Sequence, residues 1–217
     1  MPESLLETLP LPQRLALAYA PARARTAALH LLAFDARLGQ ALRAASEPIM
    51  AQMRLAWWRD QLNREPSTRE ASDALLLGLA RFDAQRDRLI ALVDGWEALL
   101  AEDFGEEAAR TFASARAQSW LALARHLGVE GRTEAILLAG QRWALADLAA
   151  GLSDPDERAA VSALARGDNA YVKLPRLLRP LAVLDGLARR SLAKGGAPLL
   201  DGPLGGLAAM RIGLLGR

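Results

Sequence analysis

The apolar residues between positions 22 and 45 recur at helical spacing, and this pattern limits the fold classes open to the chain. Ala27, Leu31, Phe34, Leu38 and Leu42 are four, three, four and four residues apart, which places them on one face of a helix. Alanine, leucine and arginine dominate the whole sequence, whereas the β-branched residues that favour strands are scarce. The sequence therefore predicts an all-α protein, a bundle of many helices.

Proline, glycine and acidic residues mark where these helices begin and end. Ser46 as N-cap and Pro48 in the first turn are expected to start the third helix. That helix is apolar on two sides, with Met50, Met53 and Trp57 on one of them, so we expect it to be buried between neighbours. The expected helices span about 13–20, 22–45, 47–64, 69–81, 85–103, 106–127, 131–152, 155–166 and 176–194.

The 217 residues are 52% hydrophobic, enough to bury one substantial core, so we expect a single domain over 1–217. Its helical core is expected at 13–194, followed by a glycine-rich C-terminal segment at 195–217. The end of that segment is apolar with two arginines. It docks on the helical core, lies on a membrane surface or docks on a partner.

Charge and composition exclude several classes of partner and location. The net charge is only +2, and no run combines basic residues with exposed aromatics, so we expect no binding of nucleic acid. No stretch reaches the ~18 apolar residues of a transmembrane helix. The acidic start lacks the basic region of a signal peptide, so a cytoplasmic protein is expected.

Asp147 is the carboxylate whose position most invites a functional interpretation. It shares a helical seam with Ile136, Gly140 and Trp143, which predicts that it points inward. An unpaired buried carboxylate is costly. The favoured interpretation is an ion pair with an inward arginine such as Arg25 or Arg54, and the alternative is a contact with a polar ligand or metal.

The other polar candidates have simpler interpretations. Asp35 lies at the edge of an apolar face, where we expect a boundary position. His30 and His126 lack a second ligand three or four residues away, which argues against a zinc site. The acids at 154–157 are expected to start a helix. The five tryptophans indicate core packing, or the lining of an apolar tunnel that could hold a prenyl chain.

Short motifs over about 13–194 resemble the squalene/phytoene synthase family. They are Ala33-Phe34, Arg54 with Trp57-Trp58, Asp94-Gly95, Gly140 and Leu174-Pro175. The resemblance implies a bundle of the isoprenoid-synthase type, here truncated. Enzymes of that family use divalent cations, held by two facing groups of carboxylates, to draw the diphosphate from a prenyl substrate.

The chain departs from the family where those carboxylates belong. The first aspartate-rich motif would fall on Gly39, Gln40 and Arg43, none of which is acidic. The second would fall on Ala144, Asp147, Ala150 and Gly151, where only Asp147 could ligate a metal. The pattern is most similar to the motif-poor branch of the family that includes complex I assembly factors of mitochondria.

The resemblance therefore implies a catalytically degenerate protein with no catalytic or metal-ligating residues and no cofactor. Its expected role is to bind a prenyl or lipid ligand or to assemble a respiratory complex with a protein partner, with contact at the inner membrane left open. One alternative is an active prenyltransferase, which would need Mg²⁺, and another is a plain helical scaffold with no ligand. The residues expected to contact a ligand are Phe34, Arg54, Trp57, Trp143 and Asp147.

Overall fold

The computed structural model describes residues 4–70, 72–101, 104–165, 171–201, 206 and 209–213. All regular structure in these ranges is helical, which confirms the prediction of an all-α multi-helix bundle. The α-helices are α1 (Leu11–Ala18), α2 (Ala22–Arg43), α3 (Pro48–Asn63), α4 (Ala74–Leu79), α5 (Arg86–Ala98), α6 (Glu106–His126), α7 (Thr133–Gly151), α8 (Pro155–Leu164) and α9 (Arg179–Ala193). Short 3₁₀ turns are η1 (Pro66–Thr68), η2 (Ala80–Gln85) and η3 (Arg176–Leu178).

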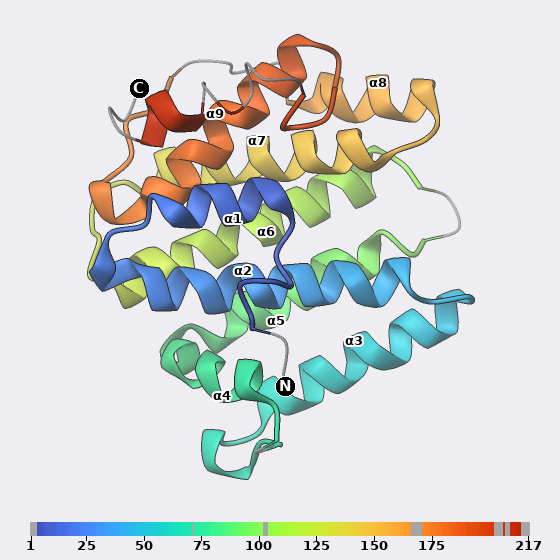
Figure 1. Ribbon diagram of the computed structural model, residues 1–217. Coiled ribbons are helices and arrows are strands. Elements are labelled where there is room, and N and C mark those ends of the chain that lie inside the picture. The colour runs from blue at the N-terminus through green and yellow to red at the C-terminus, as the bar shows by residue number, and fades with distance from the viewer. Residues whose placement is uncertain are drawn as a thin grey trace.

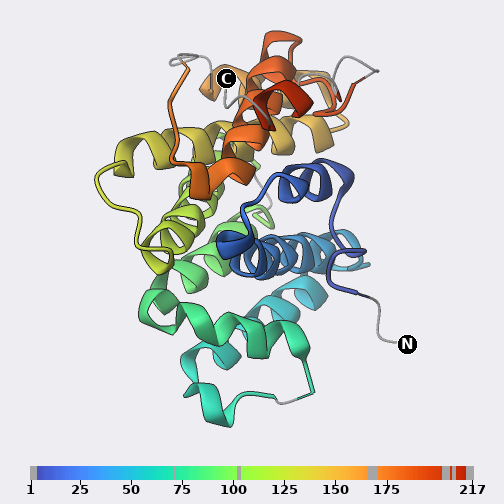
Figure 2. The same cartoon turned by 60° about the vertical axis from the view of Figure 1, so that its left-hand side comes forward.

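The helices are stacked in layers (Figure 1), with α6 at the centre of the stack, packed against α5 on one side and α7 on the other. Helix α7 in turn packs against α8 and α9, while α3 packs against α5 and α2. As a result α8 and α9 lie at one end of the molecule and α3 and α4 at the other, which both views show (Figures 1 and 2).

Capping side chains explain where several helices start. Asp154 accepts hydrogen bonds from the backbone N–H groups of Asp156 and Glu157, which confirms that the acids at 154–157 begin a helix. Ser46 as N-cap of α3 is wrong, because Glu47 holds that position and makes no side-chain cap bond. Proline at the first helical position already supplies a helical φ there.

The helix expected at 69–81 begins later, because Arg69 has another role. Its buried guanidinium donates hydrogen bonds to the backbone carbonyls of Gln61, Leu62 and Arg64, the last turn of α3, and to Asp83. Asp73 then caps α4 by accepting from the N–H groups of Leu75 and Leu76. One buried arginine thus ends α3 and ties it to η2.

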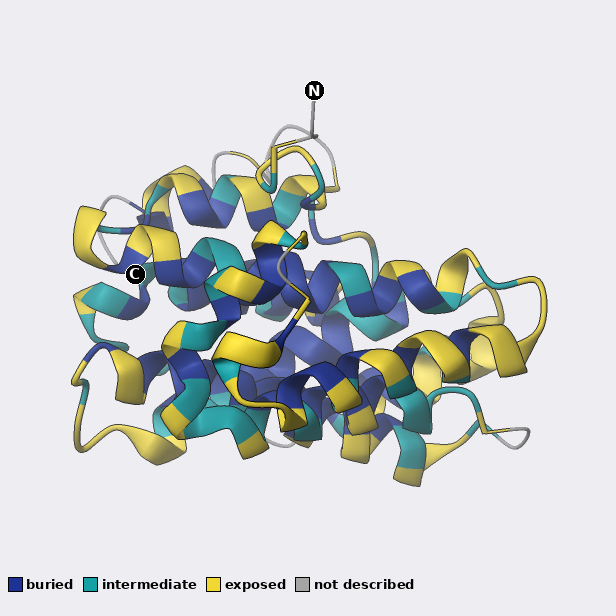
Figure 3. Cartoon of the chain, turned by 90° about the horizontal axis from the view of Figure 1, so that it is seen from below, coloured by how far each residue is buried: buried dark blue, intermediate teal, exposed yellow. Residues whose placement is uncertain are grey.

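Small residues let the central helices approach closely. A Cβ built at Gly140 of α7 would lie 2.7 Å from the Ala117 Cα and 2.9 Å from its Cβ, so the two backbones pack directly on each other. At Gly95 of α5 the Ala115 Cβ would be 2.5 Å away. The inward faces around these contacts form a continuous buried core, and exposed residues cover the outside (Figure 3).

The prediction that α3 is buried on both sides is wrong. Its inner face, with Leu55, Trp58 and Leu62, is buried against the bundle. Its outer face is open to solvent, where Met50, Met53 and Trp57 are all exposed. The sequence pattern is symmetrical between the faces, but α3 lies at the end of the stack and has neighbours on one side only.

The C-terminal segment packs on the bundle where the structure describes it. Ala209 and Ile212 are buried, and the Ile212 side chain lies against Gly186 of α9. Positions 202–205, 207–208 and 214–217, which carry much of the expected membrane contact, lie outside the described residues. Along the described part of the chain, no helix has both the length and the apolar character needed to cross a membrane.

The close contact between α6 and α7 predicts a specific cost of adding a methyl group. Gly140→Ala should lower the free energy of unfolding by about 1–3 kcal/mol, because the new Cβ meets the α6 backbone rather than a flexible side chain. Gly151→Ala is the matched control on the same helix, since nothing lies within 4 Å of a Cβ there. Urea unfolding of both variants measures the difference, and equal stabilities would contradict this account of the packing.

Candidate functional site

A buried arginine at the centre of the bundle joins two carboxylates from helices far apart in sequence. Arg116 of α6 donates through Nε and Nη2 to both oxygens of Asp35 on α2, with an Nη2–Oδ2 distance of 2.6 Å. Its Nη1 donates to Asp147 Oδ2 of α7 at 2.7 Å. Arg116 and Asp35 are almost fully buried, whereas the Asp147 side chain is 35% exposed.

Aromatic rings enclose the guanidinium of Arg116. Its Cζ atom lies 3.7 Å from the centre of the Trp143 ring, 5.3 Å from that of Phe112 and 5.6 Å from that of Trp96. Trp96 also donates its indole N–H to Asp35 Oδ1 at 3.0 Å. Burial alone would lower the pKa of Arg116, but the charges and hydrogen bonds of Asp35 and Asp147 outweigh it, so the pKa is raised and the side chain is a permanent cation.

This cluster corrects two interpretations made from sequence. Asp147 does form an ion pair, but with Arg116 rather than with Arg25 or Arg54, both of which are exposed. The prediction that Asp35 lies at the boundary of an apolar face is wrong, because its side chain is only 3% exposed and lies in the core of the bundle. Arg116 was missed because a buried arginine has the same helical spacing as an exposed one.

The carboxylates of this cluster do not fit the magnesium site that the alternative, an active prenyltransferase, would need. Both oxygens of Asp35 accept from Arg116, and Asp147 binds the same guanidinium through Oδ2. A Cβ at Gly39, where the first family aspartate would fall, would lie 2.8 Å from Cη2 of Trp96. Among the described residues, no three histidine, aspartate or glutamate side chains come together as metal ligands would.

A second buried ion pair lies between α7 and α9. Arg142 donates through Nε and Nη2 to the two oxygens of Asp185, at 2.8 and 3.0 Å. Burial raises the pKa of Asp185 above its ordinary value, although the hydrogen bond from Arg142 opposes this. Fork-like pairs of this kind fix how two helices sit against each other, so this pair positions α9 on α7.

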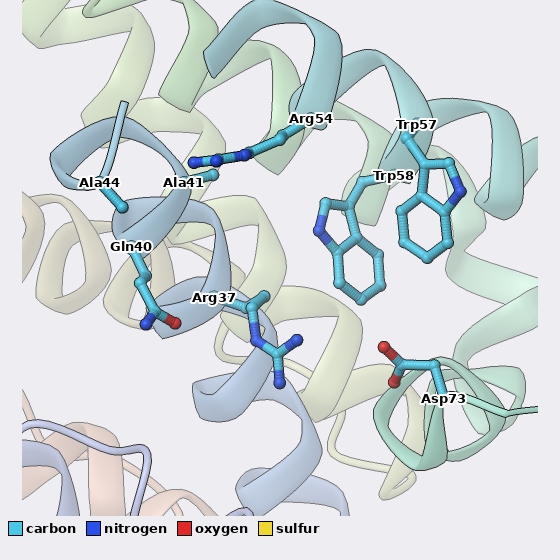
Figure 4. A pocket seen from close by; sticks show the side chains of 8 residues that line it. All are labelled: Arg37, Gln40, Ala41, Ala44, Arg54, Trp57, Trp58 and Asp73. Carbon is cyan, nitrogen blue, oxygen red and sulfur yellow. The ribbon is translucent and has the colours of Figure 1, made fainter. Parts of the chain in front are cut away.

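A groove of about 400 Å³ opens at the surface between α2 and α3. Helix α2 contributes Arg37, Gln40 and two alanines, helix α3 contributes Arg54, Trp57 and Trp58, and Asp73 lies at the far rim. Figure 4 shows Arg54 extending from α3 toward Ala41, while Arg37 and Asp73 point toward the groove from opposite sides. The groove thus combines cationic groups with apolar and aromatic walls.

Two of the cations that line the groove have no partner in the part of the chain that the structure describes. Neither Arg37 nor Arg54 forms an ion pair or a side-chain hydrogen bond there. Arg59, one turn further along α3, differs because it pairs with Asp94 and Glu97 of α5. Asp73, the acid of the groove, already accepts two backbone hydrogen bonds at the start of α4.

Four of the five residues expected to contact a ligand fall into two places, and the fifth lies in the core. Trp143 and Asp147 belong to the buried cluster around Arg116, and Arg54 and Trp57 line the groove. Phe34 is fully buried and packs edge-to-face on Trp58, with ring centres 5.2 Å apart. Sequence reasoning missed Arg37 and Gln40, because the groove forms only when α2 and α3 are side by side.

Comparison with known proteins adds no further assignment. No family model, curated protein or solved structure matches the chain.

Removing the central cation should destabilise the protein strongly. Arg116→Met leaves Asp35 buried without its counter-ion, so we expect the free energy of unfolding to fall by about 3–5 kcal/mol. Arg110→Met on the same helix breaks an exposed pair with Glu106 and should cost at most about 0.5 kcal/mol. Chemical denaturation of both variants measures the difference in their free energies of unfolding. If Arg116→Met loses no more stability than the control Arg110→Met, Asp35 does not depend on Arg116.

Proposed function

We propose that this protein is a non-catalytic scaffold, similar to squalene/phytoene synthases and of the isoprenoid-synthase fold type, that binds an anionic prenyl lipid in the groove between α2 and α3. The observation that carries this proposal is the guanidinium of Arg116 between Asp35 and Asp147. Asp147, the one acid at a position where the resemblance expects a metal ligand, is bound to this arginine, which supports a non-catalytic role.

The internal cation argues against the active-enzyme alternative. Ionising a prenyl diphosphate requires cations that contact the leaving group. Arg116 cannot do this, because its nitrogen atoms bind the two aspartates and its faces are covered by Trp143, Trp96 and Phe112. The aromatic side chains that were candidates for lining a tunnel fill this part of the interior instead.

The groove has the chemistry that an anionic prenyl lipid needs. Arg37 and Arg54, which have no partner among the described residues, can bind a phosphate or diphosphate group by charge-assisted hydrogen bonds. Trp57, Trp58 and the alanines of α2 offer apolar contacts to the start of the prenyl chain. The volume of about 400 Å³ is within the usual range of small-molecule sites. The expected role in assembling a respiratory complex stays a prediction.

Calorimetry with a non-hydrolysable farnesyl diphosphate analogue tests the proposal. We expect binding that does not require magnesium, and affinity that falls at least about tenfold for each of Arg37→Gln and Arg54→Gln, because each removes a charge-assisted hydrogen bond. Arg125→Gln is the matched control, since this exposed arginine lies at the far end of α6. Farnesol, which lacks the anionic group, should bind much more weakly.

Two results would contradict the proposal. One is binding that requires magnesium and is lost in Asp147→Asn, since this would assign the ligand to the interior and restore the enzyme alternative. The other is absence of binding by a protein whose circular dichroism spectrum and cooperative unfolding show it to be folded.

A further inference from the structure

The outer face of α3 carries a row of large apolar side chains that the fold does not use. Ile49, Met50, Met53 and Trp57 are 52%, 43%, 62% and 38% exposed. Ile49, Met53 and Trp57 are four residues apart, so they follow one line along the helix, with Met50 beside them. We call these four residues the α3 row. Isolated exposed apolar residues are ordinary, whereas a contiguous row on one helix marks a contact surface.

The α3 row is continuous with the groove. Trp57 belongs to both, because it is exposed on the outer face of α3 and also lines the cavity beside Arg54. Whatever covers the row therefore also lies at the mouth of the groove. The groove volume of about 400 Å³ suits a lipid chain and is too small for a helix of a protein partner, which is about 10–12 Å across.

The charges beside the row favour an anionic surface on the groove side. Arg54 lies between the row and the groove, and Arg37 lies across the groove on α2. Glu47 and Asp60 are exposed at the two ends of α3. The acid that does line the groove, Asp73, accepts two backbone hydrogen bonds at the start of α4, and it stands against two arginines there. Arginine with tryptophan at the edge of an apolar strip is the pattern of helices that lie flat in a membrane interface.

We propose that the α3 row docks on the surface of an anionic lipid bilayer, with α3 lying flat and the mouth of the groove facing the lipid. The proposal rests on the proposed function, because it names the bilayer as the source of the anionic lipid that enters the groove. It differs from the contact through the C-terminal segment that the sequence suggested. The described part of that segment, at 195–201, 206 and 209–213, lies at the opposite end of the molecule from α3 in Figures 1 and 2, so a flat membrane under α3 would not reach these residues.

Co-sedimentation with phosphatidylcholine vesicles, with and without phosphatidylglycerol, measures the docking. We expect binding to the anionic vesicles that weakens with salt, and a partition coefficient at least about tenfold lower for the double variant Ile49→Ser, Met53→Ser. Met210→Ser is the matched control, because Met210 is 50% exposed in the C-terminal segment. It should bind vesicles as the unchanged protein does.

Tryptophan fluorescence supplies an independent readout. Trp57 is the one tryptophan that is more than a third exposed, since Trp58, Trp96, Trp120 and Trp143 are all buried. Brominated acyl chains in the vesicles should therefore quench Trp57 most strongly, and Trp58, whose ring centre lies 4.9 Å from that of Trp57, to a smaller extent. Most of the quenching should be lost in Trp57→Phe, whereas quenching that this substitution leaves unchanged would overturn the proposed orientation.

The outcomes separate this proposal from the proposed function. Loss of vesicle binding in Met210→Ser but not in the double variant would move the contact to the C-terminal segment and overturn the proposal. Self-association that the double variant abolishes in the absence of vesicles would assign the α3 row to a second copy of the chain, with the same consequence. If the soluble farnesyl diphosphate analogue binds while vesicles do not, the docking fails and the groove function stands.

Discussion

The pairing of Arg116 with Asp35 and Asp147 is the interaction on which the interior of this bundle depends. A charge in an apolar core is tolerated only when its partners are fixed around it, and here the partners come from α2 and α7, on either side of α6. The aromatic rings of Trp96, Phe112 and Trp143 exclude water from the guanidinium. The positions of three helices are therefore coupled through one side chain.

Charged side chains are arranged differently in the interior and at the surface of the molecule. Inside, each buried charged residue that the structure describes has a partner of opposite sign, as in the pair Arg142–Asp185 that joins α7 to α9. At the surface between α2 and α3, Arg37 and Arg54 lack such partners within the described ranges of the chain and lie beside the exposed Trp57. An unpaired cation costs much more free energy in the interior of a protein than at its surface. Cations that are available to bind an anion are therefore found at the groove.

The sequence predicted the helices well, because their apolar spacing, prolines and capping acids are local signals. The start of α8 at Asp154 and the spans of α2, α6 and α7 are examples. It failed where the answer depends on neighbours. For both Asp35 and Met53, the spacing of neighbouring apolar residues does not decide whether the side chain is buried. The packing of helices distant in sequence buries Asp35 and leaves Met53 exposed. Half of the groove was predicted: Arg54 and Trp57 of α3 were expected to contact a ligand, whereas Arg37 and Gln40 of α2 were not.

The contact between Gly39 and Trp96 has an evolutionary consequence. Under the proposed family relationship, restoring an aspartate at position 39 would not restore a metal site, because its Cβ would lie 2.8 Å from the Trp96 ring. Trp96 in turn supports Asp35, which supports Arg116. The change at position 39 would therefore lower stability before any activity could be gained. Selection acting on single substitutions would therefore oppose a return to catalysis. An aspartate at position 39 would be tolerated only after other residues had changed.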